Sequence, residues 1–106
     1  MRVIIEKGEG LMAAYVISGI RVTDPAEYAN YRALSGPSVE QYGGRFLVRG
    51  GAYEVLEGDW EPQRVVVVAF DDAEQARRWW FSKEYAAAKA VRREAATANF
   101  ILIEGA

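Results

Sequence analysis

The stretch from Gln41 to Phe70, QYGGRFLVRGGAYEVLEGDWEPQRVVVVAF, constrains the fold of this chain more than any other part of the sequence. It contains two Gly-Gly pairs, a Gly-Asp-Trp sequence shortly before a proline, and a run of four valines. Glycine permits the positive φ of bends and bulges, Gly and Pro mark turns, and valine favours strands. The stretch therefore predicts a strand at Arg45–Arg49, continued by Ala52–Leu56, and an antiparallel partner at Arg64–Phe70, within a small α+β fold.

A helix is predicted before these strands. Asp24 is suited to the N-cap, Pro25 to the first helical position, and Glu27 can reach back to the cap. Pro37 has no N–H to donate to the preceding turn, so we expect a kink or a restart there, and Gly43 should end the helix. The side chains at helical spacing that should face the sheet are Tyr28, Tyr31 and Leu34.

A second helical segment is predicted after the valine strand. Asp71 is the expected N-cap, with Glu74 completing a capping box. Ser82 should cap a further helical stretch that runs through Ala95. The expected buried stripe of the first of these helices consists of Ala73, Ala76 and Trp80.

Strand-like segments at Ala13–Val22 and Phe100–Glu104 complete the order βαββαβ. This order is that of the ferredoxin-like unit. The predicted fold class is therefore α+β, with an antiparallel sheet that carries its helices on one face.

The strands do not alternate between apolar and polar residues, as a sheet with one solvated face should. Val65–Val68 and Phe100–Ile103 are apolar on both faces, and Tyr15 and Ile17 lie on the face opposite Val16. No segment is left to cover the second face. We therefore expect a second copy of the chain to cover it, sheet against sheet, in a two-fold homodimer.

Composition narrows the possible chemistry. The 106 residues suit one domain, and a net charge of −2 lacks the basic excess of a nucleic-acid-binding protein. The chain has no His and no Cys, so the commonest metal ligand, the usual general base, the thiolate nucleophile and the usual proximal haem ligand are absent. The sequence thus predicts no metal site and no cofactor.

The N-terminal residues 1–11 are expected to be an extension to a single domain of residues 12–106. Met12 is a plausible alternative start, and Val3-Ile4-Ile5 is rich in strand formers, which suggests an added edge strand. Charged residues interrupt this short apolar run, so it does not read as a signal peptide. No stretch approaches the roughly 20 apolar residues of a membrane span, and we expect a cytoplasmic protein.

Arg45 and Arg49 are the first candidate ligand-binding residues, because period-two alternation places them on one strand face with Leu47. Guanidinium groups offer bidentate donors to a carboxylate or an enolate. The competing interpretation is structural, with salt bridges across the dimer to acids such as Glu54 and Glu57. On the sequence alone we favour the structural interpretation.

Three aromatic residues complete the candidate set. Trp60 lies in the predicted turn between Gly58 and Pro62, and we expect it to cover the barrel mouth or to contact the partner subunit. Adjacent helical residues point about 100° apart, so Trp79 should face away from the stripe that contains Trp80 and could line a pocket or anchor an interface. Tyr15 offers a phenol that can donate a proton to an oxyanion. Packing alone would explain most of these residues.

Several segments together resemble the family of unknown function DUF1330, of the dimeric α+β barrel superfamily. They are MAAYVI, TDPAEYANYR, YGGRFLVRGG, LEGDW-x-P-x-R and WWFSKEYAAAKAVR, and the resemblance covers Met12 to Ala106. It implies a ferredoxin-like protomer that dimerises through its sheet. It implies no activity, although superfamily relatives include cofactor-free monooxygenases, small isomerases, lactonases and haem-dependent enzymes.

The sequence therefore favours an uncharacterised dimeric small-molecule-binding or structural protein. Its ligand would be small and anionic or aromatic, and no catalytic residue is assigned. The alternative is a cofactor-independent enzyme, monooxygenase- or isomerase-like, that acts on a small aromatic or enolisable carboxylate and uses Tyr, Arg, Asp or Glu for proton transfer. An enclosed cavity with a polar group between the helices and the sheet would favour the enzyme, and a solidly packed interior would favour the structural role.

Overall fold

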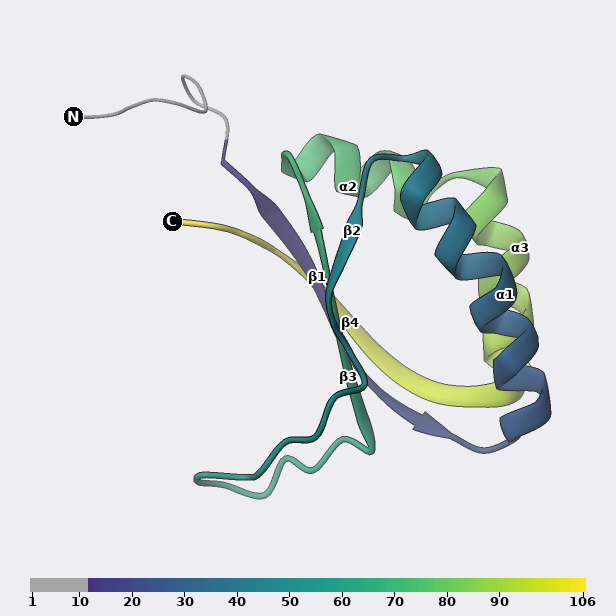
Figure 1. Ribbon diagram of the computed structural model, residues 1–106, viewed down its shortest axis with the longest axis vertical. Coiled ribbons are helices and arrows are strands. Elements are labelled where there is room, and N and C mark those ends of the chain that lie inside the picture. The colour runs from purple at the N-terminus through teal and green to yellow at the C-terminus, as the bar shows by residue number, and fades with distance from the viewer. Residues whose placement is uncertain (1–11) are drawn as a thin grey trace.

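The computed structural model describes residues 12–106, so the expectation for residues 1–11 lies outside the described part of the chain (Figure 1). The elements, in chain order, are β1 (Ala14–Val22), α1 (Pro25–Gln41), β2 (Arg45–Arg49), β3 (Arg64–Phe70), α2 (Ala73–Trp80), α3 (Lys83–Ala95) and β4 (Ala96–Glu104). The sheet order is β2-β3-β1-β4, and every pairing is antiparallel. All the helices lie on one face of the sheet (Figure 1). The predicted ferredoxin-like α+β fold is confirmed.

Helix α1 begins where its sequence predicts. The Asp24 carboxylate accepts a hydrogen bond from the Glu27 N–H at 3.2 Å. The helix then continues unbroken through Pro37, so the expected restart is wrong. The preceding turn at Ala33 is exposed, which leaves its carbonyl accessible to water. Gly43 ends the helix with a φ of +80°, as its sequence predicts.

Helix α2 begins one residue later than predicted. Asp72, and not Asp71, is the N-cap, and its carboxylate accepts from the Gln75 N–H at 2.8 Å. The buried stripe runs at three-residue spacing and ends at Trp79, so the predictions that Trp80 completes it and that Trp79 faces away from it are both wrong. Trp80 is half-buried at the side of the core. The α3 prediction is confirmed, with Ser82 as N-cap.

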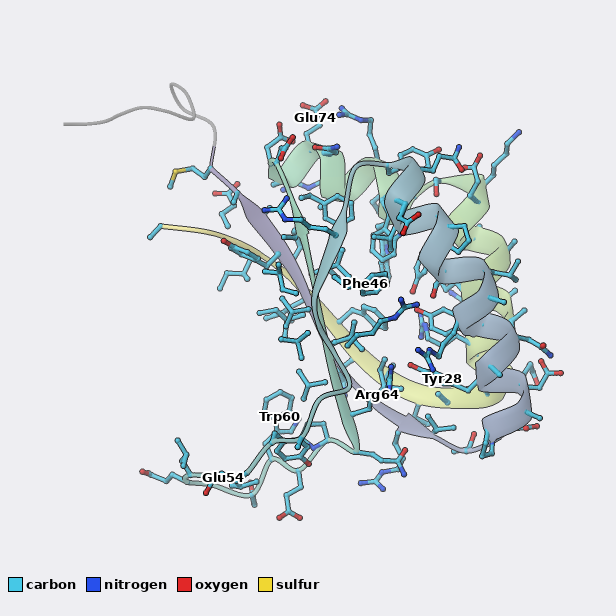
Figure 2. The ribbon with its side chains drawn as sticks, viewed as in Figure 1. Tyr28, Phe46, Glu54, Trp60, Arg64 and Glu74 are labelled. Carbon is cyan, nitrogen blue, oxygen red and sulfur yellow. The ribbon has the colours of Figure 1, made fainter. Side chains whose placement is uncertain are left out.

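The chain between β2 and β3 is an arm of residues 50–63 that contains no strand, so the predicted continuation at Ala52–Leu56 is wrong. Gly50 turns the chain at a φ of +79°, and its N–H donates to the Val65 carbonyl at 2.9 Å. Figure 2 shows the arm, with Glu54 and Trp60, on the side of the sheet away from the helices. At the other end of the chain, β4 begins at Ala96, which is earlier than predicted.

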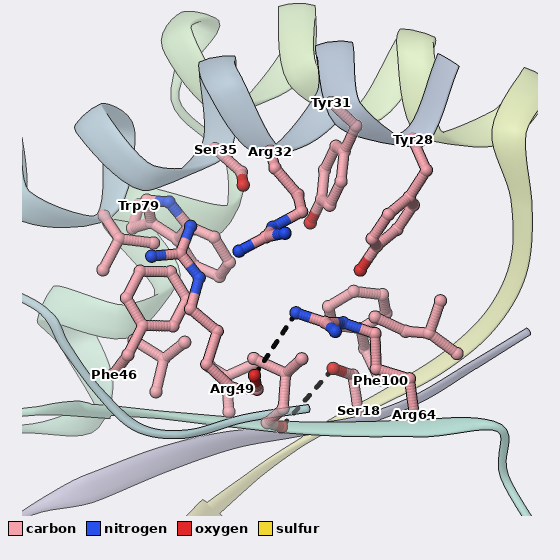
Figure 3. Close-up of a pocket in the computed structure, with 15 residues that line it drawn as sticks. Ser18, Tyr28, Tyr31, Arg32, Ser35, Phe46, Arg49, Arg64, Trp79 and Phe100 are labelled. Carbon is pink, nitrogen blue, oxygen red and sulfur yellow. Dashed lines mark hydrogen bonds between the residues drawn. The ribbon is translucent and has the colours of Figure 1, made fainter. Parts of the chain in front are cut away.

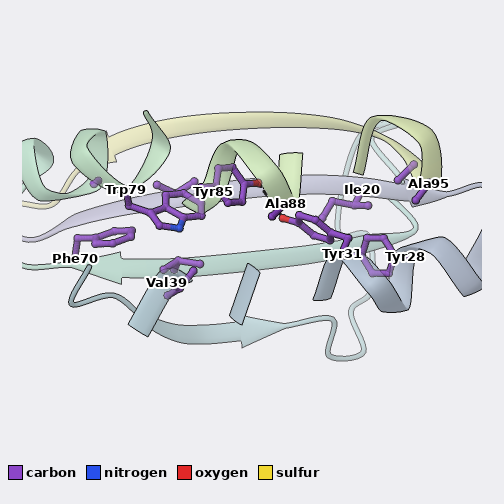
Figure 4. Close-up of a cluster of buried hydrophobic side chains, with 13 residues drawn as sticks. Ile20, Tyr28, Tyr31, Val39, Phe70, Trp79, Tyr85, Ala88 and Ala95 are labelled. Atoms are coloured by element: carbon purple, nitrogen blue, oxygen red, sulfur yellow. Dashed lines mark hydrogen bonds between the residues drawn. The ribbon is translucent and has the colours of Figure 1, made fainter. Parts of the chain in front are cut away.

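The core lies between the sheet and the helices and is rich in aromatic rings (Figure 4). The Trp79 and Tyr85 rings are fully buried, with centroids 4.2 Å apart. The Trp79 indole N–H donates to the Ser38 hydroxyl at 3.0 Å. Ser38 and Ser35 are buried and Leu34 is 43% exposed, so the prediction that Leu34 faces the sheet is wrong.

The opposite sheet face carries Tyr15 and Ile17, away from Val16, as the alternation predicts. Ile17 pairs with Val67 on one side and Ile101 on the other, which makes a row of aliphatic side chains across three strands. Ile101 is 57% exposed. Within residues 12–106 this apolar face has no cover from a helix (Figure 1).

Candidate functional site

A β-bulge in β2 decides where its arginines point. Phe46 pairs with Val68 and Arg49 with Val66, because the register shifts by one residue between Phe46 and Val48. Directly paired residues project to the same sheet face. Arg49 therefore lies on the helix-facing side, together with Phe46 and the two valines. The prediction that Arg45 and Arg49 share a face is wrong, because the extra residue reverses the alternation between them.

A cavity of about 30 Å³ lies between α1 and the sheet (Figure 3). Arg32 and Arg49, which line its rim, are exposed to solvent. Arg32 from α1, Arg49 from β2 and Arg64 from β3 all line the cavity. Figure 3 shows the three guanidinium groups approaching one another from these separate elements. The volume suits one or two waters, or the head group of a small anion. We call this space the arginine cavity.

Two of these guanidinium groups pack closely against neighbouring parts of the chain. The Arg49 guanidinium lies 3.9 Å from the centroid of the Phe46 ring. It also approaches Gly36 of α1, where a β-carbon would be 3.2 Å from the arginine nitrogen. A β-carbon on Gly50 would collide with the Arg64 guanidinium. These glycines therefore make room for the arginines.

The cavity is electropositive. Partial burial lowers the pKa of Arg49 below its usual value, and the neighbouring charges of Arg32 and Arg64 lower it further. Glu40 acts in the opposite direction, but more weakly. The described residues that line the cavity include no Asp and no Glu. The ion pair found within residues 12–106 lies elsewhere, between Arg78 and Glu74 on the outer surface of α2, at a distance of 3.3 Å.

Arg64 has unused hydrogen-bonding capacity. One terminal nitrogen donates a long hydrogen bond, 3.4 Å, to the Arg49 carbonyl (Figure 3). Its Nε–H is buried and has no partner among the described residues. A buried donor without a partner is costly, and such groups in native proteins usually have a specific explanation. A ligand that accepts this hydrogen bond would supply one.

The other polar groups around the cavity are neutral hydroxyls. Ser18 lies on the sheet side, and Tyr28, Tyr31 and Ser35 lie on α1 (Figure 3). The Tyr31 hydroxyl shares a 2.9 Å hydrogen bond with Tyr85. Burial, together with this neighbour, raises the pKa of Tyr31 well above its usual value. Tyr31 therefore stays protonated, so it can take part in hydrogen bonds but cannot act as a base.

The five residues predicted as ligand contacts fall into two groups. Arg49 and Trp79 line the arginine cavity. Arg45 and Tyr15 both pair with Ala69 and lie on the opposite face of the sheet. Trp60 is also on this opposite face, over Gly19, where a β-carbon on the glycine would meet the Trp60 ring at 3.1 Å. The structure thus does not bring the predicted residues into a single site.

Two of the cavity arginines were not among the predicted contacts, although the sequence carries a signal for each. Arg32 is four residues after Tyr28, and therefore on the same face of α1. Arg64 is two residues before Val66, and therefore on the same face of β3. The orientation of the third arginine, Arg49, depends on the bulge in β2. The sequence of β2 carries no signal for that bulge.

Residues 12–106 contain no group of three or more acidic side chains that could hold a metal ion, and no helix long and apolar enough to cross a bilayer. The model of the domain of unknown function DUF1330 matches residues 13–106. The chain belongs to the DUF1330 family. No curated protein matches the sequence significantly.

Solved structures share the fold of this DUF1330 protein at low sequence identity. The RPA0582 protein of unknown function from Rhodopseudomonas palustris has a TM-score of 0.75 at 18% identity, over 90% of this chain and 83% of that one. SnoaB, a cofactor-independent oxygenase from Streptomyces nogalater, has 0.63 at 16% identity, over 90% and 94%. A putative antibiotic biosynthesis monooxygenase from Caulobacter crescentus has 0.60 at 13% identity, over 91% and 92%. These similarities show the fold alone.

Proposed function

We propose that this DUF1330 protein binds a small organic anion, with a carboxylate as the recognised group, in the arginine cavity. One observation carries the proposal. Three guanidinium groups from α1, β2 and β3 surround a cavity whose described lining has no carboxylate to neutralise them. Unrelieved like charge is unfavourable, and a bound anion would relieve it.

A carboxylate matches the donors at this site. Guanidinium groups bind carboxylates through two parallel hydrogen bonds, which are stronger than hydrogen bonds between neutral groups. The buried Arg64 Nε–H is an additional donor. Arg32 and Arg49 are exposed at the rim, where a ligand can enter and where dissolved salt should weaken its binding.

The lining offers less for catalysis than for binding. A general base must accept a proton near neutral pH, and the described lining contains arginine, tyrosine and serine but no acidic residue. Tyr31 keeps its proton, because burial raises its pKa. The cavity has polar groups between the helices and the sheet, but Arg32 and Arg49 at its rim are exposed, so it is not the enclosed cavity that would favour the enzyme. Its charged groups are suited to holding an anion.

A second candidate function is cofactor-independent oxygenation of an enolisable aromatic carboxylate. The similarity of fold to SnoaB supports it. The three arginines could also stabilise an enolate, because fixed positive charge favours developing negative charge. The test is oxygen uptake with 4-hydroxyphenylpyruvate. If the protein catalyses this reaction, oxygen uptake should exceed the spontaneous rate, and the Arg49→Ala variant should lose this excess. Uptake at the protein-free rate would contradict the oxygenase function.

We further propose that the protein is a homodimer through the open sheet face. The aliphatic row at Ile17, Val67 and Ile101 supports this arrangement. The arm adds exposed apolar side chains on the same side, with Leu56 89% and Trp60 64% exposed. Large exposed apolar patches commonly mark protein interfaces. The arginine cavity, on the other face of the sheet, would remain accessible in such a dimer.

A thermal-shift comparison tests anion binding. We expect benzoate, succinate or acetate to stabilise the protein, and benzamide, which has the shape of benzoate but no charge, to have no effect. A ligand at about 100 times its Kd stabilises the fold by roughly 2.7 kcal/mol. Equal responses to benzoate and benzamide, or no response to any of the acids, would contradict the proposal.

Two arginines of the same strand provide a matched pair of variants. Arg49→Ala removes a guanidinium from the cavity and should weaken binding of the best acid by about 1.5–3 kcal/mol, the value of a hydrogen bond to a charged group. Arg45→Ala removes the same charge from the opposite face and should leave the affinity unchanged. Calorimetric titration measures both. Equal losses in the two variants would indicate a nonspecific effect of net charge.

A further inference from the structure

A second and larger cavity lies beside the arginine cavity. It is about 310 Å³ in volume and lies between α2 and the edge strand β4. Its walls are mainly apolar and include Trp80, Phe81 and Leu102, and Arg77 is the one charged residue among the lining residues that the structure describes. The volume is within the usual range of small-molecule sites, and apolar and aromatic walls are typical of them. We call this space the α2–β4 cavity.

The two cavities share walls. Val16 of β1 and Phe100 of β4 line both of them. Val16 is a buried part of the sheet, whereas Phe100 is only partly buried. The Phe100 side chain therefore stands between a small cationic space and a larger apolar space.

The Phe100 ring is held by contacts with two side chains. Its centroid lies 5.1 Å from that of Trp80, and the Arg92 guanidinium lies 4.5 Å from it on the side of α3. Arg92 is 7% exposed, and its Nε–H has no partner among the described residues. The ring is thus retained by aromatic and cation–π contacts, which a ligand of similar character can replace.

We infer that the ligand is an amphipathic carboxylic acid whose carboxylate lies among the three arginines and whose apolar body passes Phe100 into the α2–β4 cavity. This inference rests on the proposed function. The arginine cavity, at about 30 Å³, accommodates a head group but no larger organic body. The adjoining 310 Å³ supplies the missing space, and its apolar walls define the class of the body. Turning of the Phe100 side chain joins the two spaces, which makes Phe100 a specificity-determining residue.

A chain-length series tests this inference. Calorimetric titrations with butyrate, hexanoate, octanoate and decanoate should show a Kd that falls about three- to fourfold for each methylene that enters the α2–β4 cavity. This factor corresponds to about 0.8 kcal/mol per buried methylene. Octanol, which has the apolar body without the charge, should bind at least tenfold more weakly than octanoate.

Three variants test the two ends of the ligand and the side chain between the two cavities. Phe81→Ala removes a side chain that is 78% exposed and lines only the larger cavity, so the fold should tolerate it. It should weaken octanoate several-fold and change the Kd of butyrate by less than twofold. Arg49→Ala should weaken all four acids by the same factor. Phe100→Ala should tighten octanoate relative to butyrate, because it removes the partition.

The possible results distinguish the inference from the proposed function. If butyrate binds in an Arg49-dependent way but the longer acids bind no more tightly, the proposed function stands and the inference is overturned. The inference is also overturned if octanol binds as tightly as octanoate, or if Phe81→Ala weakens butyrate and octanoate equally. If no acid binds at any chain length, the proposed function fails, and the inference fails with it.

Discussion

The hydrogen bond between the Tyr31 and Tyr85 hydroxyls, 2.9 Å long, joins α1 to α3 in the core. Both rings are buried. Tyr31→Phe should destabilise the protein by about 1–2 kcal/mol, because it leaves the buried Tyr85 hydroxyl without its partner. Tyr53→Phe, on the exposed arm, should change stability by less than about 0.5 kcal/mol. Urea denaturation measures both, and equal effects would contradict the assignment of the buried bond.

Tyr31 should also make stability depend on alkaline pH. Its pKa is raised in the folded protein, chiefly by burial, whereas in the unfolded chain it titrates near 10. The stabilisation is complete below pH 10 and declines above it, because the unfolded state then loses the proton that the folded state retains. Urea denaturation between pH 8 and pH 11 should show this decline, and Tyr31→Phe should reduce its slope. An unchanged slope in the variant would be inconsistent with this origin.

At the scale of single residues, the sequence predicted the role of a residue where nearby residues determine it. It failed where the pairing register of two strands determines which way a side chain points. Asp24 and Ser82 cap helices, and Gly43 ends one, as their side chains or their freedom at positive φ dictate. The orientation of Arg49 depends on a bulge between Phe46 and Val48. Pairing with β3 determines that bulge, and no local property of the β2 sequence encodes it.

At the scale of elements, the N-terminus of α2 provides a direct comparison of two adjacent aspartates. Asp72 accepts the hydrogen bond from the Gln75 N–H, whereas Asp71 is exposed before the helix. Asp72→Ala should cost about 1 kcal/mol of stability, the usual value for loss of an N-cap. Asp71→Ala should cost less than about 0.5 kcal/mol. Thermal denaturation of both variants measures this difference, and the reverse order would place the cap at Asp71.

Which of the two adjacent tryptophans of α2 is buried was harder to predict. The buried stripe is Ala73, Ala76 and Trp79. Trp79 is three residues after Ala76 and Trp80 is four residues after it, and both spacings can share one helix face. The type and order of the elements were predictable because β3 is a short run of β-branched residues and α3 begins at a clear N-cap, Ser82. The phase of α2 was not.

At the scale of the whole molecule, the two sheet faces carry different predicted roles. The face under the helices holds both cavities, and the open face is the proposed dimer interface. Sedimentation equilibrium at micromolar concentration should give about twice the 11.8 kDa chain mass. A soluble monomer under these conditions would contradict the dimer.

A charge in the middle of the open face should disrupt this assembly. Ile17→Lys places an ammonium group between Val67 and Ile101, where burial against a partner would remove it from water. We expect a monomeric protein that still binds the carboxylate. Ala87→Lys, on the exposed side of α3, should remain dimeric. A fully dimeric Ile17→Lys protein would place the interface elsewhere.

The most direct test of the arginine cavity as an anion site is a crystal structure with 4-bromobenzoate, in which anomalous scattering locates the bromine. Crystals would be grown at about ten times the Kd measured by titration. We predict the carboxylate within hydrogen-bonding distance of the guanidinium groups of Arg49 and Arg64, with the bromine directed towards Phe100. Bromine density on the open sheet face beside Arg45, with the arginine cavity unoccupied, would contradict the account.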